Sequence, residues 1–101
     1  MSRLRWSHRA RRELLAIGRY IARDDPAIAR QWVDRLRERA RAAAAVPWSG
    51  RRVPEVDRDD VREVLLRSYR IVYRVLEHEI HVLTVFEGHR LFPGLTILDG
   101  E

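Results

Sequence analysis

The sequence has no cysteine and no lysine. Without cysteine the chain can form no disulfide, and thiol catalysis and cysteine metal sites are excluded with it. Long apolar runs are also missing. None approaches the roughly 20 residues that cross a membrane, and the N-terminal stretch lacks the apolar region of a signal peptide. We therefore expect a cytoplasmic protein with no membrane anchor.

Arginine alone supplies the positive charge. The 20 basic residues are all arginines and outnumber 15 acidic residues, giving a net charge of +5. A small basic domain suits an anionic partner, either a phosphate backbone or an acidic polypeptide. With 101 residues and 46% hydrophobic composition, we expect one globular domain over residues 1–101, in which residues 91–101 form a C-terminal tail.

Three stretches in the second half of the chain have the pattern of strands. Residues 69–76 alternate with a period of two and are rich in aromatic and β-branched side chains. Residues 61–66 precede them and residues 80–86 follow, each across a connection short enough for a hairpin turn. Residues 80–86 are apolar at nearly every position, which predicts the central strand, covered on both faces.

The first half of the chain has helical periodicity. Ser7 is a suitable N-cap for a helix to about Arg23, and Asp25 with Pro26 suits the start of a second helix that ends at Val46. Residues 4–6 are expected to form an edge strand. The order β-α-α-β-β-β predicts an α+β two-layer fold, with an N-terminal helical hairpin on one face of a mostly antiparallel sheet. The other face is left open or covered only by the loop 48–60 and the tail.

Five ionisable residues could converge at one end or on one face of this sheet: Glu55, Arg62, Arg70, His89 and Arg90. A carboxylate, an imidazole and guanidiniums are the groups needed to cleave RNA without a metal ion, as base, acid and stabilisers of the phosphorane charge. They are equally the groups of a salt-bridged sheet face. Spacing alone favours this structural alternative, in which Glu55 pairs with Arg51 or Arg52.

The four histidines lack the spacing of a metal site. They include no i, i+4 pair on a helix, and His78 and His81 would point to opposite faces of a strand. We therefore expect neither a metal nor a cofactor.

Several motifs together give the chain a resemblance to a known family. They are Pro47 with Gly50-Arg51, Val53-Pro54-Glu55, Arg62-Glu63, the core from Ser68 to Val75 (SYRIVYRV), and Gly88-His89-Arg90. With the β-α-α-β-β-β order, the chain from Leu4 to about Phe92 resembles the RelE/ParE superfamily of toxins from type II toxin-antitoxin operons. The resemblance implies a growth-arresting protein that a co-expressed antitoxin holds inactive.

The superfamily divides into two functional branches. RelE-like members are ribosome-dependent endoribonucleases that cut mRNA, and this resemblance would make Glu55, Arg70 and His89 catalytic, with Arg62 and Arg90 as further basic positions. ParE-like members lack that set and act on DNA gyrase. The chain lacks the lysines and the C-terminal tyrosine that this resemblance would require of a ribonuclease. Its long helical hairpin is more similar to that of ParE-like members. We therefore favour a gyrase poison. The alternatives are a metal-independent mRNA endoribonuclease and a decayed toxin that serves only as antitoxin partner and co-repressor.

The resemblance also implies the partners. A small antitoxin with an acidic or disordered C-terminal segment is expected to wrap the helical hairpin and the adjacent sheet. The expected antitoxin-binding residues are Trp32, Arg35, Leu36 and Arg39. The chain has no helix-turn-helix or ribbon arm, so operator DNA would be bound only through the antitoxin.

Overall fold

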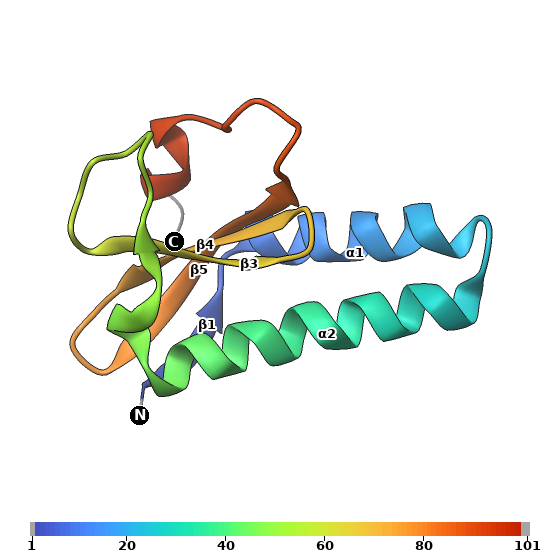
Figure 1. Cartoon of the computed structure of the whole chain (residues 1–101), viewed down its shortest axis with the longest axis horizontal. Coiled ribbons are helices and arrows are strands. Elements are labelled where there is room, and N and C mark those ends of the chain that lie inside the picture. Colours follow the sequence, from blue (N-terminus) through green and yellow to red (C-terminus); the bar gives the residue numbers. More distant parts are fainter. Residues whose placement is uncertain (1, 100–101) are drawn as a thin grey trace.

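A computed structural model describes residues 2–99 and has a helical hairpin packed on one face of a sheet (Figure 1). In chain order the elements are β1 (Arg3–Trp6), α1 (His8–Ala22), α2 (Pro26–Ala45), the 3-10 helix η1 (Pro47–Ser49), β2 (Arg51–Arg52), β3 (Val61–Leu66), β4 (Tyr69–Val75), β5 (Glu79–Glu87) and the 3-10 helix η2 (Leu95–Asp99). This confirms the predicted α+β fold and adds β2, η1 and η2 to it.

The five strands lie in the order β1-β5-β4-β3-β2. β1 runs parallel to β5, and all other neighbouring pairs are antiparallel. β5 is therefore an interior strand, but the central strand is β4, and the sequence-based placement of β5 at the centre is wrong by one position. The unforeseen β2, which adds a strand beyond β3, moves the centre of the sheet to β4.

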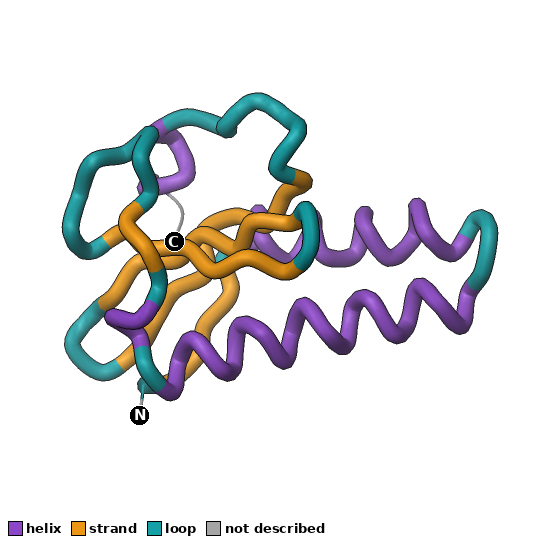
Figure 2. The backbone as a smooth tube through the Cα atoms, viewed as in Figure 1, coloured by secondary structure: helices purple, strands orange, loops and turns teal. Residues whose placement is uncertain are grey.

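Side-chain caps start both helices at the expected residues. The Ser7 hydroxyl accepts a hydrogen bond from the Ala10 amide at 3.0 Å, and Asp25 Oδ1 accepts from the amides of Ala27 and Ile28 at 3.0 and 3.2 Å. These caps satisfy amides that have no partner within the helix. The end of the helical hairpin that carries the α1–α2 turn extends beyond the edge of the sheet (Figure 2). Among residues 2–99, no helix is long and apolar enough to cross a membrane.

The core is divided between the two faces of the sheet. On the helix side, buried side chains of α1 and α2, including Leu14 and Leu36, pack against Ile71, Tyr73 and Val82. The opposite face, hereafter the far face, has a smaller cluster made of Val53, Val61, Val72, Leu83, Phe86 and Ile97. The loop before β3 and the C-terminal tail supply its cover, as the sequence indicated. β4 and β5 are thus buried on both faces, which explains the apolar pattern of residues 80–86.

β5 is irregular at its middle. Val72 lies opposite Thr84, while the next residue, Tyr73, lies opposite Val82, so Leu83 is the extra residue of a bulge. Because of the bulge, the helix-side core receives Ile80 and Val82 from the first half of β5 but Val85 from the second half, and Phe86 joins Leu83 on the far face.

Candidate functional site

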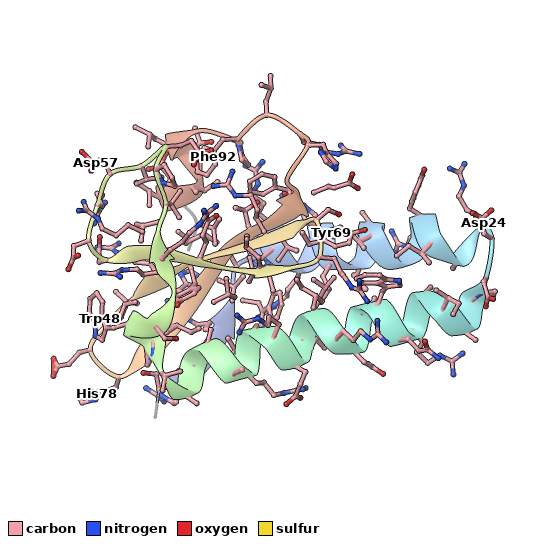
Figure 3. The ribbon with its side chains drawn as sticks, in the orientation of Figure 1. Asp24, Trp48, Asp57, Tyr69, His78 and Phe92 are labelled. Carbon is pink, nitrogen blue, oxygen red and sulfur yellow. The ribbon has the colours of Figure 1, made fainter. Side chains whose placement is uncertain are left out.

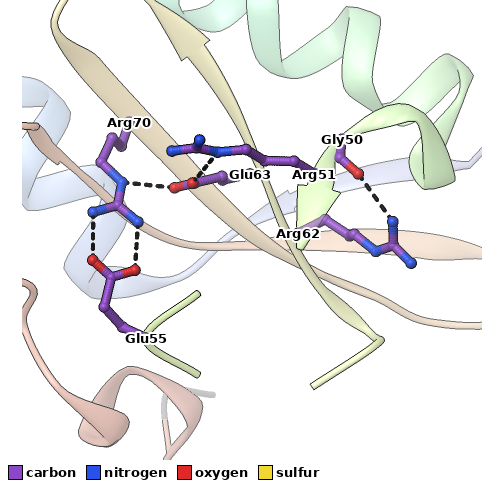
Figure 4. Close-up of polar contacts among 6 residues, drawn as sticks. All are labelled: Gly50, Arg51, Glu55, Arg62, Glu63 and Arg70. Carbon is purple, nitrogen blue, oxygen red and sulfur yellow. Dashed lines mark hydrogen bonds and ion pairs between the residues drawn. The ribbon is translucent and has the colours of Figure 1, made fainter. Parts of the chain in front are cut away.

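An ion-pair cluster crosses the far face of the sheet (Figure 4). Arg70 in β4 lies at its centre. Its Nε atom donates to Glu63 Oε1 in β3 at 2.7 Å, and its two Nη atoms donate to the two carboxylate oxygens of Glu55 at 2.9 and 2.8 Å. Arg51 in β2 donates through Nε to the second Glu63 oxygen at 2.6 Å. These four residues, Arg51, Glu55, Glu63 and Arg70, are called the Arg70 cluster below.

Strand register brings the cluster together. Arg51 lies directly opposite Glu63 in the β2–β3 pair, while Arg70 lies opposite Leu65, two residues further along β3. Glu63 and Leu65 share a face because side chains alternate along a strand. Arg70 is therefore the diagonal neighbour of Glu63, within reach of a long side chain.

Burial decides how the cluster behaves electrostatically. The exposed fraction of the side chain is 0% for Glu63, 12% for Arg70 and 39% for Glu55. A buried carboxylate without a cation would be strongly destabilising, and Glu63 has two guanidiniums. The hydrogen bonds from Arg70 lower the pKa of Glu55 from 4.5 to about 2. The same pairing with Glu55 raises the pKa of Arg70 above its ordinary value.

Two aromatic rings complete the surroundings of Arg70. Its guanidinium carbon lies 5.2 Å from the ring centroid of Phe86 in β5 and 5.6 Å from that of Phe92 in the segment after β5. Both distances fall within the range of cation–π attraction. Arg70 thus contacts β3, β5, the loop at Glu55 and the segment at Phe92, and the cluster fastens two irregular segments to the sheet.

The structure unites only part of the predicted set. Glu55 and Arg70 form a bidentate ion pair, so the expected pairing of Glu55 with Arg51 or Arg52 is wrong. Arg51 is opposite Glu63 instead, and Arg52 pairs with Asp57 at 3.1 Å because the loop returns past it.

Arg62, His89 and Arg90 lie apart from the Arg70 cluster. Arg62 stacks over Trp48 at 5.1 Å and donates to the Gly50 carbonyl at 3.1 Å, on the other side of Glu63 (Figure 4). His89 is 82% exposed, and its Nε2 atom lies 4.0 Å from Glu87 Oε1. Within residues 2–99, no hydrogen bond or ion pair joins Arg62, His89 or Arg90 to Glu55 or Arg70.

The arrangement has chemical consequences. A carboxylate whose pKa is about 2 is a weak general base near neutral pH, since the best base has a pKa near the working pH. Each nitrogen of the Arg70 guanidinium already donates one hydrogen bond to a carboxylate, so a phosphate would have to compete with Glu55 and Glu63 for the group. No group of three or more histidine, aspartate or glutamate side chains among the described residues could hold a metal ion.

Comparison with known proteins identifies the family. Residues 4–92 match the family model described as ParE toxin of type II toxin-antitoxin system, parDE. The chain belongs to the ParE toxin family. A Sinorhizobium fredii protein named "Putative toxin Y4kP" is 38% identical over 95 residues, which cover 90% of this chain and 93% of that protein. A solved structure titled "Chromosomal ParDE TA system from P. aeruginosa" is 26% identical with a TM-score of 0.71, over 86% of this chain and 96% of that one.

The surface expected to bind the antitoxin of this ParE-family toxin is only partly available. Leu36 is fully buried in the helix-side core, so it supports the packing of α2 and cannot contact a partner. The other three residues lie at the surface between α2 and the β3–β4 hairpin. Trp32 packs on Tyr69 at 5.8 Å between ring centroids, Arg35 stacks on Trp32, and Arg39 donates to the Leu65 carbonyl at 3.2 Å.

Sequence reasoning gave no role to Glu63, the most buried acid of this ParE-family chain. A signal was present, because strand alternation places residue 63 on the same face as Val61, which is apolar and buried. A glutamate at a position that alternates with core residues indicates a buried ion pair and calls for two nearby arginines.

Proposed function

We propose that this ParE-family toxin arrests growth by binding DNA gyrase and not by cleaving mRNA. The observation that carries the proposal is that the charged groups of the Arg70 cluster are already paired with one another. Each guanidinium nitrogen of Arg70 donates to Glu55 or Glu63, and the side chain is only 12% exposed. The membership of the ParE family supports the same conclusion, since ParE-like members of the superfamily act on gyrase.

The geometry argues against the ribonuclease alternative. An RNA-cleaving site needs a base, an acid and a cation within hydrogen-bond reach of one phosphate. Here the candidate base has its pKa lowered to about 2 by the candidate cation, and the candidate acid, His89, is an exposed side chain in the turn after β5. A role for the Arg70 cluster in holding the fold accounts for the same contacts without further assumptions.

We also propose that residues 1–101 act as one toxin domain. The family match ends at residue 92, but Ile97 in η2 is 2% exposed and completes the far-face cluster with Val53 and Val61. Residues 93–99 therefore belong to the folded unit that would carry the activity.

The proposal is tested by inducing the chain without its antitoxin and following DNA and protein synthesis separately by pulse labelling. Binding to gyrase predicts that DNA synthesis stops first, and that the purified chain inhibits supercoiling by purified gyrase or traps gyrase-cleaved DNA. His89→Ala should retain full toxicity, because an exposed turn residue contributes little to stability.

Two results would overturn the proposal. If protein synthesis stops first and ribosome-bound mRNA is cut, and His89→Ala abolishes the cutting, the toxin is a ribonuclease. If expression of the folded chain has no effect on growth, the chain is a decayed toxin that serves only as partner of its antitoxin.

A further inference from the structure

The helical hairpin carries the whole net charge of the chain. Residues 8–45 contain ten arginines and five acidic residues, while the rest of the chain contains ten of each. The net charge of +5 therefore lies on α1, α2 and the turn between them, and the remainder is neutral. The charged hairpin also projects from the molecule. Its tip at Asp24 lies beyond the edge of the sheet, at the opposite end of the long axis from Asp57 (Figure 2, Figure 3).

The pairing of charges differs between the hairpin and the rest of the molecule. Seven of the ten arginines outside the hairpin form ion pairs with carboxylates, so that part is neutralised internally. Within the described hairpin, only Arg9 and Arg41 form ion pairs, with Glu13 and Glu38. Six exposed hairpin arginines make no side-chain hydrogen bond, ion pair or ring contact within residues 2–99: Arg11, Arg12, Arg19, Arg23, Arg30 and Arg37. Their guanidiniums are available to an anion from outside the chain.

Helical periodicity arranges these arginines in rows. Residues seven and eleven positions apart lie within about 20° of each other around a helix. Arg12, Arg19 and Arg23, the C-cap of α1, therefore form one row along that helix, about 10 and 6 Å apart along its axis. Arg30 and Arg37 form a second row on α2. Because α1 and α2 pack into the same core, the two rows are held in fixed relative positions.

The two rows meet at an open groove on the hairpin. The groove, of about 350 Å³, is lined by residues of α1 and α2 alone, and Arg19, Arg30 and Arg37 stand along it. Asp34 lies about one turn from both Arg30 and Arg37 on α2, but it forms an ion pair with neither in the described chain. Three guanidiniums from two helices therefore share one surface on which no carboxylate bonds them.

We propose that the hairpin binds the phosphate backbone of duplex DNA without reading its sequence. Duplex DNA carries one negative charge for about every 1.7 Å of its axis, and arginine binds phosphate through two parallel hydrogen bonds. Two fixed rows of guanidiniums can therefore neutralise several phosphates together. Such binding differs from recognition of an operator, which needs contacts with base edges.

The composition of the rows favours DNA over an acidic polypeptide as the partner. Affinity between proteins depends mainly on a few large apolar or aromatic anchors, whereas charge alone supplies the binding of DNA without sequence preference. Along the α1 row, the residue between Arg12 and Arg19 is Ala16, which offers no such anchor. The inference goes beyond the proposed binding of gyrase and does not depend on it. A toxin held on DNA would be concentrated on the substrate of gyrase.

The test measures the affinity of the purified chain for a fluorescently labelled DNA duplex of arbitrary sequence, by anisotropy at several salt concentrations. Neutralisation of about five phosphates predicts a slope of about −4.5 for the logarithm of affinity against the logarithm of salt concentration. A second duplex of unrelated sequence should bind with nearly the same affinity. A slope weaker than about −2, or a sequence preference above roughly tenfold, overturns the proposal. Tighter binding of polyglutamate or single-stranded RNA than of the duplex, at equal salt concentration, would assign the hairpin to another class of partner and overturn it too.

A matched pair of triple variants locates the contact with DNA. Each removes three exposed arginines that form no ion pair within residues 2–99, so the two variants have the same net charge. The hairpin variant carries Arg19→Gln, Arg30→Gln and Arg37→Gln, and the control variant carries Arg3→Gln, Arg67→Gln and Arg90→Gln. The hairpin variant should lose about 2.7 from the magnitude of the slope and bind DNA roughly 30-fold or more weakly at about 0.1 M salt. The control variant should stay within about threefold of the unmodified chain.

Equal losses of affinity in the two variants would show that net charge and not the hairpin attracts DNA, and would overturn the proposal. Glutamine has nearly the same helix propensity as arginine, so both variants should fold, and circular dichroism checks that they do. Because the assay contains no gyrase, a negative result here does not bear on the proposed function.

Discussion

Removing the Arg70 side chain should lower the free energy of unfolding far more than changing its partner Glu55 or the exposed Arg41. In Arg70→Ala, the buried Glu63 retains only its ion pair with Arg51 among the described residues, while Glu55 loses both of its strong hydrogen bonds. Breaking a buried pair by deleting one partner costs about 3–5 kcal/mol. The remaining contact with Arg51 reduces this cost, and the lost stacking on Phe86 and Phe92 adds to it. We expect a loss of about 3 kcal/mol in the free energy of unfolding.

Glu55→Gln should cost much less. The lowered pKa of Glu55 would correspond to a few kcal/mol if the group were buried, but its side chain is 39% exposed, and solvent screening reduces the value to about 1 kcal/mol. The prediction therefore includes a ranking: Arg70→Ala should lose more free energy of unfolding than Glu55→Gln. It follows from the burial of Glu63, which Arg70→Ala affects and Glu55→Gln does not.

The assay is urea unfolding at pH 7, followed by tryptophan fluorescence and circular dichroism. Arg41→Ala is the matched control, because Arg41 pairs with Glu38 at 2.8 Å but their side chains are 59% and 74% exposed. Its loss should stay within about 0.5 kcal/mol. The reasoning is refuted if Arg70→Ala lies within about 1 kcal/mol of the unmodified chain, or if Glu55→Gln costs as much as Arg70→Ala.

Three further predictions concern acid, α1 and Gly50. Because the pKa of Glu55 is lower in the folded chain, its contribution to stability is complete above pH 4.5 and is lost as the pH falls towards 2. The stability difference between the unmodified chain and Glu55→Gln should therefore vanish over that range. A difference that grows on acidification would contradict the assignment. Glu13→Ala removes the acceptor of the Val85 amide, so it should lower the free energy of unfolding by about 1–3 kcal/mol and speed hydrogen exchange of that amide. Glu13→Gln keeps an acceptor oxygen and should recover most of both losses. Gly50→Ala should lower the melting temperature, because its new methyl group would collide with the Tyr73 hydroxyl and lie 2.9 Å from the Glu63 carbonyl oxygen. Adding Tyr73→Phe to the same chain should relieve part of the strain. A melting temperature unchanged by Gly50→Ala would refute the contact.

The elements with strong local signals were predictable from the sequence. Ser7 and Asp25 are side-chain caps that depend only on their own helix starts, and the alternation in residues 69–75 is set by one strand. The two-residue β2 gives no such signal, because a period of two cannot be recognised over two residues. Its presence beside β3 shifted the centre of the sheet from β5 to β4.

The candidate site depended on information that the local sequence does not contain. Fifteen positions separate Glu55 from Arg70, and their contact is decided by the path of the loop and not by any periodicity. Leu36 lies on the apolar stripe of α2 with Trp32, but only the crossing of the helix over the sheet determines that the leucine is covered and the tryptophan stays at the surface. Charge pairing among many arginines is likewise ambiguous until the register is known.

The parallel pairing of β1 with β5 affects when the fold can be completed during synthesis. Leu4 lies opposite Ile80, so the first strand to leave the ribosome must wait for the last strand before it can enter a sheet. The helical hairpin can form from local contacts in the meantime, as N-terminal segments do during translation. The far-face core closes later still, when Ile97 arrives. The complete sheet and both of its cores can therefore form only after nearly the whole chain has been synthesised.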